Sequence, residues 1–256
     1  MISRGDEKLV RALRRRKIRE VERLFLAEGV RVVEELLDSG LDLTLALAAP
    51  SLEDTPRGRA LAVRLEKRGS LRRVGEGELN ALAATDGPQG VLAVARVPEG
   101  ALESLAPAGR ALVAVLDGIQ DPGNFGAVVR SADAFGALAL AALPGTVDPW
   151  NPKSVRAAAG SSFRLPVVQP GPTDLVKWLR RNDFMILGAD GAGQPIGELR
   201  LPARAALVLG NEGAGIGAEM RAALDGLVAV PIRGGAESLN VGVAAGILLY
   251  LLTRSE

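Results

Sequence analysis

Residues 111–136, ALVAVLDGIQDPGNFGAVVRSADAFG, join a short apolar run to a helix-like stretch through a polar loop. The run at 111–116 predicts a buried strand, and the helix is expected to open near Asn124. Arg130 then lies about one and a half turns into the helix. Backbone amides at a helix start, together with a guanidinium, would suit an anion. The alternative is that Asp121-Pro-Gly forms a turn, Asn124 caps the helix and Arg130 is a surface residue.

The same alternation continues toward the C-terminus. Short, nearly continuous apolar runs lie at 111–116, 137–143, 184–189, 205–209 and 227–232, with helix-like stretches at 126–135, 173–181 and 217–224. Strands that are buried on both faces and alternate with helices predict a parallel sheet in an α/β domain. Parallel sheets bind ligands at the carboxyl ends of their strands, so the loops after these runs are the candidate sites.

Two further loops follow predicted strands. Residues 210–217, GNEGAGIG, contain glycines that allow close backbone approach to a ligand or a positive φ. This loop lacks the Gly-Lys-Ser/Thr of a phosphate-binding P-loop, and Glu212 in its middle would repel a phosphate. Residues 230–240, VPIRGGAESLN, lead into an apolar segment rich in small residues, which predicts a closely packed helix or a subunit interface. Ser238 is the candidate N-cap of that helix.

The N-terminal part of the chain has a different pattern. Short apolar runs and amphipathic charged stretches predict a small α/β domain over residues 1–96, then a Pro- and Gly-containing linker at 97–109 and a second domain at 110–256. Residues 4–23 hold nine basic side chains against four acids, and residues 57–73 hold seven against one. Arginine forks suit phosphate groups, so the clusters favour a surface facing RNA or DNA; the alternative is a solvated helix face.

The chain of 256 residues contains no His and no Cys. Their absence excludes a Ser-His-Asp triad, imidazole acid–base chemistry, disulfides and thiolate metal sites, whereas an all-carboxylate Mg²⁺ site stays open. Catalysis would have to use Arg, Asp, Glu, Asn, Ser, backbone amides and a bound cofactor. The charged N-terminus lacks a signal-peptide core, and the longest uncharged apolar stretch, residues 238–253, is shorter than the roughly 20 residues that span a bilayer. We therefore expect a cytoplasmic protein.

Together, the three loops resemble the signature motifs of the SpoU, or TrmH-like, RNA ribose methyltransferases. The first matches N-x-G-x-x-x-R-(S/T)-A-x-x-F-G at Asn124, Gly126, Arg130, Ser131, Ala132, Phe135 and Gly136. The second matches G-x-E-x-x-G-(I/L) at Gly210, Glu212, Gly215 and Ile216. The third matches I-P-x-x-G-x-x-x-S-L-N-V-x-V-A over residues 230–244, with Val230 in place of the first Ile. Gly242 stands where many members have Ser.

This resemblance implies a SPOUT-class fold, in which the C-terminal segment of the parallel-sheet domain passes through a loop and forms a deep trefoil knot. It also implies a preceding small α/β, ribosomal-protein-like RNA-binding domain, to which residues 23–33 are similar. S-adenosylmethionine would bind in the knot, mainly to backbone groups. The implied cofactor positions are Ala189, Gly210, Asn211, Gly213, Val230, Ile232, Ser238 and Leu239. A homodimer with active sites near the subunit interface is also implied.

The implied reaction is methyl transfer to a ribose 2′-hydroxyl of RNA. Family members are proposed to use the motif-one arginine, here Arg130, near the substrate phosphate as proton acceptor. An arginine normally stays protonated, so a phosphate clamp and oxyanion stabiliser is the safer physical role. Asn124, Glu212, Ser238 and Asn240 would orient Arg130 and the ribose. The residues expected to contact RNA are Arg14, Arg15, Arg16, Lys17 and Arg130.

The substrate and two other function classes stay open at this point. A separate N-terminal domain and the chain length favour ribosomal RNA, with transfer RNA as the second choice, and no metal is expected. A non-catalytic RNA-binding or ribosome-assembly protein of the same fold is the first alternative. A Mg²⁺-dependent phosphoryl-transfer enzyme using Asp117 and Asp121 is the second, although the chain lacks a phosphate loop with Lys.

Overall fold

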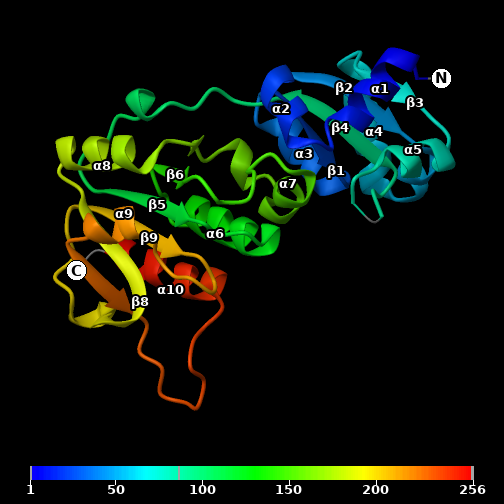
Figure 1. The fold of residues 1–256 in the computed structure, drawn as a ribbon. Coiled ribbons are helices and arrows are strands. Elements are labelled where there is room, and N and C mark those ends of the chain that lie inside the picture. Colours follow the sequence, from blue (N-terminus) through cyan, green and yellow to red (C-terminus); the bar gives the residue numbers. More distant parts are fainter. Residues whose placement is uncertain (1, 86, 255–256) are drawn as a thin grey trace. The chain divides into compact units, whose positions relative to one another are not determined.

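The structure, a computed structural model, describes residues 2–85 and 87–254. The chain forms two compact units, one made of residues 1–98 with 150–163 and the other of residues 99–149 with 164–256. Each unit has its own sheet, which can be followed in Figure 1.

The first unit is a four-stranded sheet with helices on both faces. Its strands, in the order β1-β4-β2-β3, are β1 (Leu24–Glu28), β4 (Val91–Arg96), β2 (Leu43–Ala48) and β3 (Leu71–Arg73). Only the pair β2–β3 is parallel. The helices are α1 (Arg4–Ala12), α2 (Arg16–Glu22), α3 (Val30–Asp38), η1 (Pro50–Asp54), α4 (Pro56–Lys67) and α5 (Glu76–Leu82).

Alternate residues of β1 enter two different cores. Phe25 and Ala27 pack in a cluster with apolar residues of α3 and α4, whereas Leu24 and Leu26 pack in a cluster with residues of α1 and α5. Successive side chains of a strand point to opposite faces of a sheet, so helices on both faces bury the whole strand. The predicted small α/β domain is thus present.

A later segment of the chain completes the first unit. It contains α7 (Pro152–Ala158) and η3 (Ser161–Phe163). The ring centroid of Phe25 lies 4.8 Å from that of Trp150 and 5.6 Å from that of Phe163. The sequence-based division assigned this segment to the second domain, whereas the structure packs it in the first unit because its aromatic rings fill the core there.

The second unit is a six-stranded, fully parallel sheet in the order β10-β8-β9-β5-β6-β7. Its strands are β5 (Ala111–Asp117), β6 (Ala139–Ala142), β7 (Val167–Val168), β8 (Met185–Pro195), β9 (Arg204–Gly210) and β10 (Gly226–Ala229). The helices are η2 (Leu102–Ser104), α6 (Pro122–Ala134), α8 (Pro172–Arg181), η4 (Ile196–Glu198), α9 (Ala218–Ala222) and α10 (Val241–Thr253). The predicted parallel sheet and its five apolar strands are confirmed. The sequence does not predict β7, because two residues carry no periodic signal.

The caps of α6 and α10 are not Asn124 and Ser238, the residues considered for that role as the alternative to a ligand site. Asp121 caps α6 by accepting the backbone N–H of Asn124 at 2.8 Å, and Pro122 occupies the first turn. Asn240, rather than Ser238, caps α10 and accepts the N–H groups of Gly242 and Val243. Capping by Asp121 leaves the Asn124 side chain available for other hydrogen bonds.

The segment predicted as a linker is docked on the second unit over most of its length. Leu102 is buried in the core of that unit, and Leu105 packs against the same cluster. The Arg204 guanidinium also donates to the carbonyl oxygens of Pro107 and Gly109 at 3.3 and 3.2 Å. Apolar side chains and backbone hydrogen bonds therefore fix a segment that has no regular periodicity.

Small residues allow α10 to lie directly on α6, as the red and green helices of Figure 1 show. A Cβ at Gly242 would lie 2.8 Å from the Cβ of Ala127, and one at Gly246 would lie 3.3 Å from the Ser131 hydroxyl. The predicted close packing of this helix is confirmed.

In the described part of the chain, no helix is both long and apolar enough to cross a membrane.

Because Phe163 belongs to the core of the first unit, its substitution should destabilise that unit and not the second one. Phe163→Leu should lower the stability of the first unit by about 1–2 kcal/mol, because it removes a ring contact with Phe25. Phe184→Leu is the matched control, because Phe184 stacks on Trp178 in the second core at 5.5 Å. Hydrogen exchange followed by mass spectrometry should show faster exchange of β1 in the first variant and of β5 or β9 in the second. Faster exchange of β9 with unchanged β1 in Phe163→Leu would contradict the assignment.

Candidate functional site

A cavity of about 400 Å³ lies where the loops after β9 and β10 meet the middle of β8. It is lined by residues 189–191, 209–212, 228–230 and 237–241, with Gly215, Ile232, Ala244 and Leu248. The strands are parallel, so the loops after neighbouring strands gather at one edge of the sheet. The cavity therefore occupies the position that the strand pattern predicts for a ligand site.

Most of the predicted cofactor positions face this cavity. Ala189, Gly210, Asn211, Val230, Ile232, Ser238 and Leu239 line it, whereas Gly213 does not. Sequence reasoning did not single out two of the lining residues, Asp190 and Glu237. Asp190 directly follows the predicted strand at 184–189, so the rule about strand ends could have identified it.

A chain of hydrogen bonds connects the three motif loops. The Asn124 amide donates from Nδ2 to Oε1 of Glu212 at 2.8 Å. Its Oδ1 accepts a hydrogen bond from Nδ2 of Asn240 at 2.9 Å. The carbonyl oxygen and the amide nitrogen of one side chain are thus both used, which fixes the orientation of Asn124. The structure brings these three predicted residues together at the side of the cavity that Glu212 and Asn240 line.

The loop after β9 has a tight shape that depends on glycine. Asn211 and Gly215 exchange two backbone hydrogen bonds of 2.9 Å, and the Asn211 Oδ1 accepts the N–H groups of Gly213 and Ala214. A Cβ at Gly210 would lie 2.3 Å from the backbone carbon of Gly215, so no larger residue fits there. Backbone groups of the loop consequently come within reach of the cavity.

Asp190 is the carboxylate at the β8 side of the cavity. Its Oδ1 accepts the Ala192 N–H at 3.0 Å, and its Oδ2 accepts from the Arg221 guanidinium at 3.1 Å. The Ala192 hydrogen bond, followed by the Arg221 hydrogen bond, lowers the pKa of Asp190 below its ordinary value. Asp190 is therefore an anion at neutral pH.

The side chains of Arg130 and Ser238 do not take part in the hydrogen-bond chain of Asn124, Glu212 and Asn240. Arg130 is exposed on α6 and does not line the cavity, and its guanidinium makes no hydrogen bond or ion pair with the described residues. Ser238 lines the cavity and is exposed, and its hydroxyl likewise has no partner among the residues described. Both side chains are thus available to a ligand, but the structure does not show Asn124, Glu212 or Asn240 orienting Arg130.

The four basic residues predicted to contact RNA in the first unit have different environments. The Arg14 guanidinium donates to the carbonyl oxygens of Ala81 and Ala83, at 2.7 and 2.5 Å, and Arg16 pairs with Glu20 at 2.7 Å. The side chains of Arg15 and Lys17 are exposed and have no polar partner among the described residues.

Ion pairs involve three of the seven basic side chains in the second basic cluster, residues 57–73. Arg57 pairs with Glu34, Arg64 with Asp38, and Arg73 with both Glu53 and Glu66. Four acids from outside or within the cluster therefore compensate three of its arginines. Among the described residues, Arg59, Lys67, Arg68 and Arg72 form no ion pair, so the cluster as a whole stays basic.

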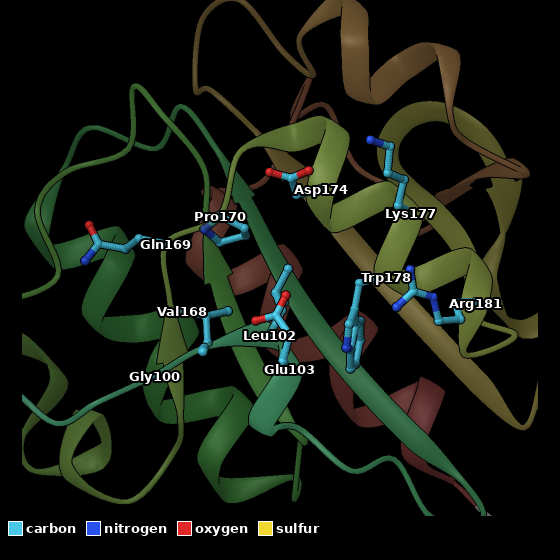
Figure 2. Close-up of a pocket in the computed structure, with 11 residues that line it drawn as sticks. Gly100, Leu102, Glu103, Val168, Gln169, Pro170, Asp174, Lys177, Trp178 and Arg181 are labelled. Carbon is cyan, nitrogen blue, oxygen red and sulfur yellow. The ribbon is translucent and has the colours of Figure 1, made fainter.

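A second cavity, of about 340 Å³, is lined by α8, η2 and residues 168–170 at the end of β7, the edge strand opposite β10 (Figure 2). Figure 2 shows Asp174, Lys177, Trp178 and Arg181 along α8, opposite Leu102 of η2. This cavity contains none of the predicted site residues.

Among residues 2–85 and 87–254, no group of three or more His, Cys, Asp or Glu side chains is arranged to hold a metal ion.

Comparison with known families assigns both parts of the chain. Residues 111–250 match the SpoU rRNA Methylase family, and residues 8–93 match the MRM3-like substrate binding domain. The first match covers the second sheet and all three motif loops. The second covers most of the first unit.

Individual proteins are similar over nearly the whole length. The chain is 37% identical to the Bacillus subtilis 23S rRNA (guanosine(2553)-2′-O)-methyltransferase RlmP, over 94% of this chain and 92% of that protein. It is 33% identical to the Coxiella burnetii 23S rRNA (guanosine-2′-O-)-methyltransferase RlmB, over 89% and 94% of the two chains.

A solved structure supports the same relationship. The SpoU methyltransferase AviRb of Streptomyces viridochromogenes, in complex with AdoMet, superposes with a TM-score of 0.87 and 28% identity over 98% of both chains. The motifs, the parallel sheet and these similarities agree: the chain belongs to the SpoU rRNA methylase family.

Proposed function

We propose that this protein transfers a methyl group from S-adenosylmethionine to a ribose 2′-hydroxyl of 23S ribosomal RNA. The observation that carries the proposal is the hydrogen-bond chain Asn240–Asn124–Glu212 beside a cavity at the carboxyl edge of the sheet. The two relatives described above are named as 23S rRNA guanosine 2′-O-methyltransferases, and this supports the RNA class. Action on ribosomal RNA also supports a cytoplasmic location.

The cavity is suited to S-adenosylmethionine in its size and its chemistry. Its volume lies within the roughly 300–1,000 Å³ of small-molecule sites, and backbone groups around Gly210 are open to it. No Lys or Arg is among its lining residues, which disfavours the phosphates of a nucleotide but suits a sulfonium cation. We assign the predicted cofactor positions to this cavity, with Gly213 acting only through its place in the same loop.

When bound, S-adenosylmethionine supplies the electrophilic methyl group. The protein then has to position the ribose and manage the charge that develops on its 2′-oxygen. The exposed Arg130 would hold an RNA phosphate with its guanidinium fork. Glu212, Asn240 and Ser238 would position the ribose and cofactor at the cavity, while Asn124 keeps Glu212 and Asn240 in place. With no imidazole in the chain, the hydroxyl proton must leave to Arg130, a carboxylate, the RNA phosphate or water.

The fold proposal includes a knot and a homodimer. From β10 at the sheet edge, the chain returns through residues 230–240 to α10, which packs on α6, β5, β9 and η4. This crossing back over the middle of the sheet supports passage of the C-terminal segment through a loop. α10 also leaves Val243 and Tyr250 about half exposed, at 52% and 50%, which supports a dimer formed through this helix.

Arg130 tests the catalytic assignment. Arg130→Ala should lower methyl incorporation into ribosomal RNA at least about 100-fold, because the developing oxyanion and the phosphate lose their charged donor. The affinity for S-adenosylmethionine should stay unchanged, since Arg130 does not line the cavity. Arg110→Ala, which removes another exposed arginine of the second unit, is the control. Full activity of Arg130→Ala would refute the assignment.

Two neighbouring glycines test the cofactor site. Gly210→Ala should weaken S-adenosylmethionine binding at least about tenfold in calorimetry, because a Cβ there must displace the 211–215 loop. Gly213→Ala is the matched control, since a Cβ at Gly213 has only the Asn211 Oδ1, at 3.7 Å, within 4 Å. Gly210→Trp should remove binding altogether. Equal affinities of the two alanine variants would argue against this loop as the cofactor site.

Arg15 and Lys17 test the contribution of the first unit to RNA binding. The double variant Arg15→Gln, Lys17→Gln should reduce the salt slope of log K by about 0.7–0.9 for each phosphate contact that is lost. The double variant Arg64→Gln, Arg73→Gln is the control with equal charge change, because carboxylates already pair both arginines. Filter binding across a salt series measures both. An unchanged slope in the first variant would count against this surface.

A further inference from the structure

The cofactor cavity has an unusual charge for a site that adjoins an RNA substrate. Of the described residues that line it, three carry carboxylates, Asp190, Glu212 and Glu237, and none carries a positive charge. A site that used nucleotide phosphates would carry the opposite sign. The acidic lining therefore favours the binding of a ligand with positive charge.

The three carboxylates are compensated to different extents. Glu212 accepts hydrogen bonds from the neutral amides of Asn124, at 2.8 Å, and Asn211, at 3.4 Å, so its charge stays uncancelled. Glu237 is exposed and has no ion-pair or hydrogen-bond partner among the residues described. Only Asp190 has a cationic partner, Arg221, whose guanidinium is 3.1 Å away and does not itself line the cavity.

The proposed cofactor and its product differ in charge. S-adenosylmethionine carries a sulfonium, an ammonium and a carboxylate, and its net charge is +1. Loss of the methyl group converts the sulfonium to a neutral thioether, so S-adenosylhomocysteine has a net charge of zero. The two molecules share every other polar group. A negative potential at the cavity therefore acts on the difference between them, and it favours the charged form.

We propose, on the basis of the cofactor site assigned above, that Asp190 and Glu237 make the cavity select the cationic cofactor over its neutral product. Each turnover converts a ligand that the carboxylates attract into one that they do not. The carboxylates thus favour loading of S-adenosylmethionine and release of S-adenosylhomocysteine. Asp190 and Glu237 thus determine which of the two ligands the cavity prefers. Arg221 partly neutralises the charge of Asp190 and so weakens the negative potential in the cavity.

The Asp190–Arg221 pair allows a test in which charge and structure predict different results. Asp190→Asn removes a negative charge from the cavity lining, whereas Arg221→Gln leaves the Asp190 charge uncompensated. Both variants break the same ion pair. A purely structural role would make them behave alike, but an electrostatic role makes them shift ligand preference in opposite directions.

The measured quantity is the ratio of two dissociation constants, that of S-adenosylhomocysteine divided by that of S-adenosylmethionine, from calorimetry on the full chain. We expect Asp190→Asn and Glu237→Gln each to lower this ratio about threefold to tenfold, and Arg221→Gln to raise it by a similar factor. In the wild type the ratio should fall as salt is raised from 0.05 to about 1 M, because the Debye length shortens to about 3 Å.

Asp174→Asn is the matched control. It changes the net charge by the same amount at the other cavity, where Figure 2 shows Asp174 on α8, and it should leave the ratio unchanged. A ratio that is the same in all variants, or that moves in one direction in both Asp190→Asn and Arg221→Gln, would overturn the inference while the cofactor site stands. Failure of the wild type to bind either ligand would instead overturn the proposed function, and the inference with it.

Discussion

The two hydrogen bonds of the Asn124 side chain connect parts of the chain that lie far apart in sequence. One partner, Glu212, is 88 residues away and the other, Asn240, is 116 residues away. A primary amide has one acceptor and one donor group, so a single side chain can hold a carboxylate on one side and another amide on the other. The relative positions of the three motif loops, and hence the shape of the cavity, depend on this residue.

Local features of the sequence support that arrangement. Asp121 caps α6 in place of Asn124, so the amide is free to bond across loops. Gly210 lets the 211–215 loop fold back closely, and Gly242 lets α10 approach α6 at the level of Ala127. Gly210 and Gly242 are needed because neighbouring atoms lie close to them, whereas Asp121 is needed for the carboxylate that caps the helix.

The absence of His and Cys gives the site its chemical character. With no imidazole or thiolate, reactivity would come from the cofactor, and the protein would contribute position and charge. Here the charges have a simple distribution: carboxylates line the cavity, whereas Arg130 is exposed on the helix that carries Asn124. Opposite charges in these two places suit a cationic cofactor and a polyanionic substrate.

The sequence by itself determined the α/β class, the parallel sheet and the loops that form the cavity, because apolar periodicity and glycine placement are local signals. It also determined the residues Asn124, Glu212 and Asn240 that meet there, through motifs whose spacing is characteristic. Only the tertiary structure decided that Asp121 and Asn240 are the caps, and that residues 150–163 complete the first unit. It also decided that, among the described residues, the Arg14 side chain has polar partners whereas those of Arg15 and Lys17 have none. The contacts of Arg14 and the packing of Phe25 with Phe163 join residues distant in sequence, and periodicity along the chain contains no information about such contacts. Each cap is a local hydrogen bond, but several neighbouring polar residues could make it, and periodicity does not choose between them.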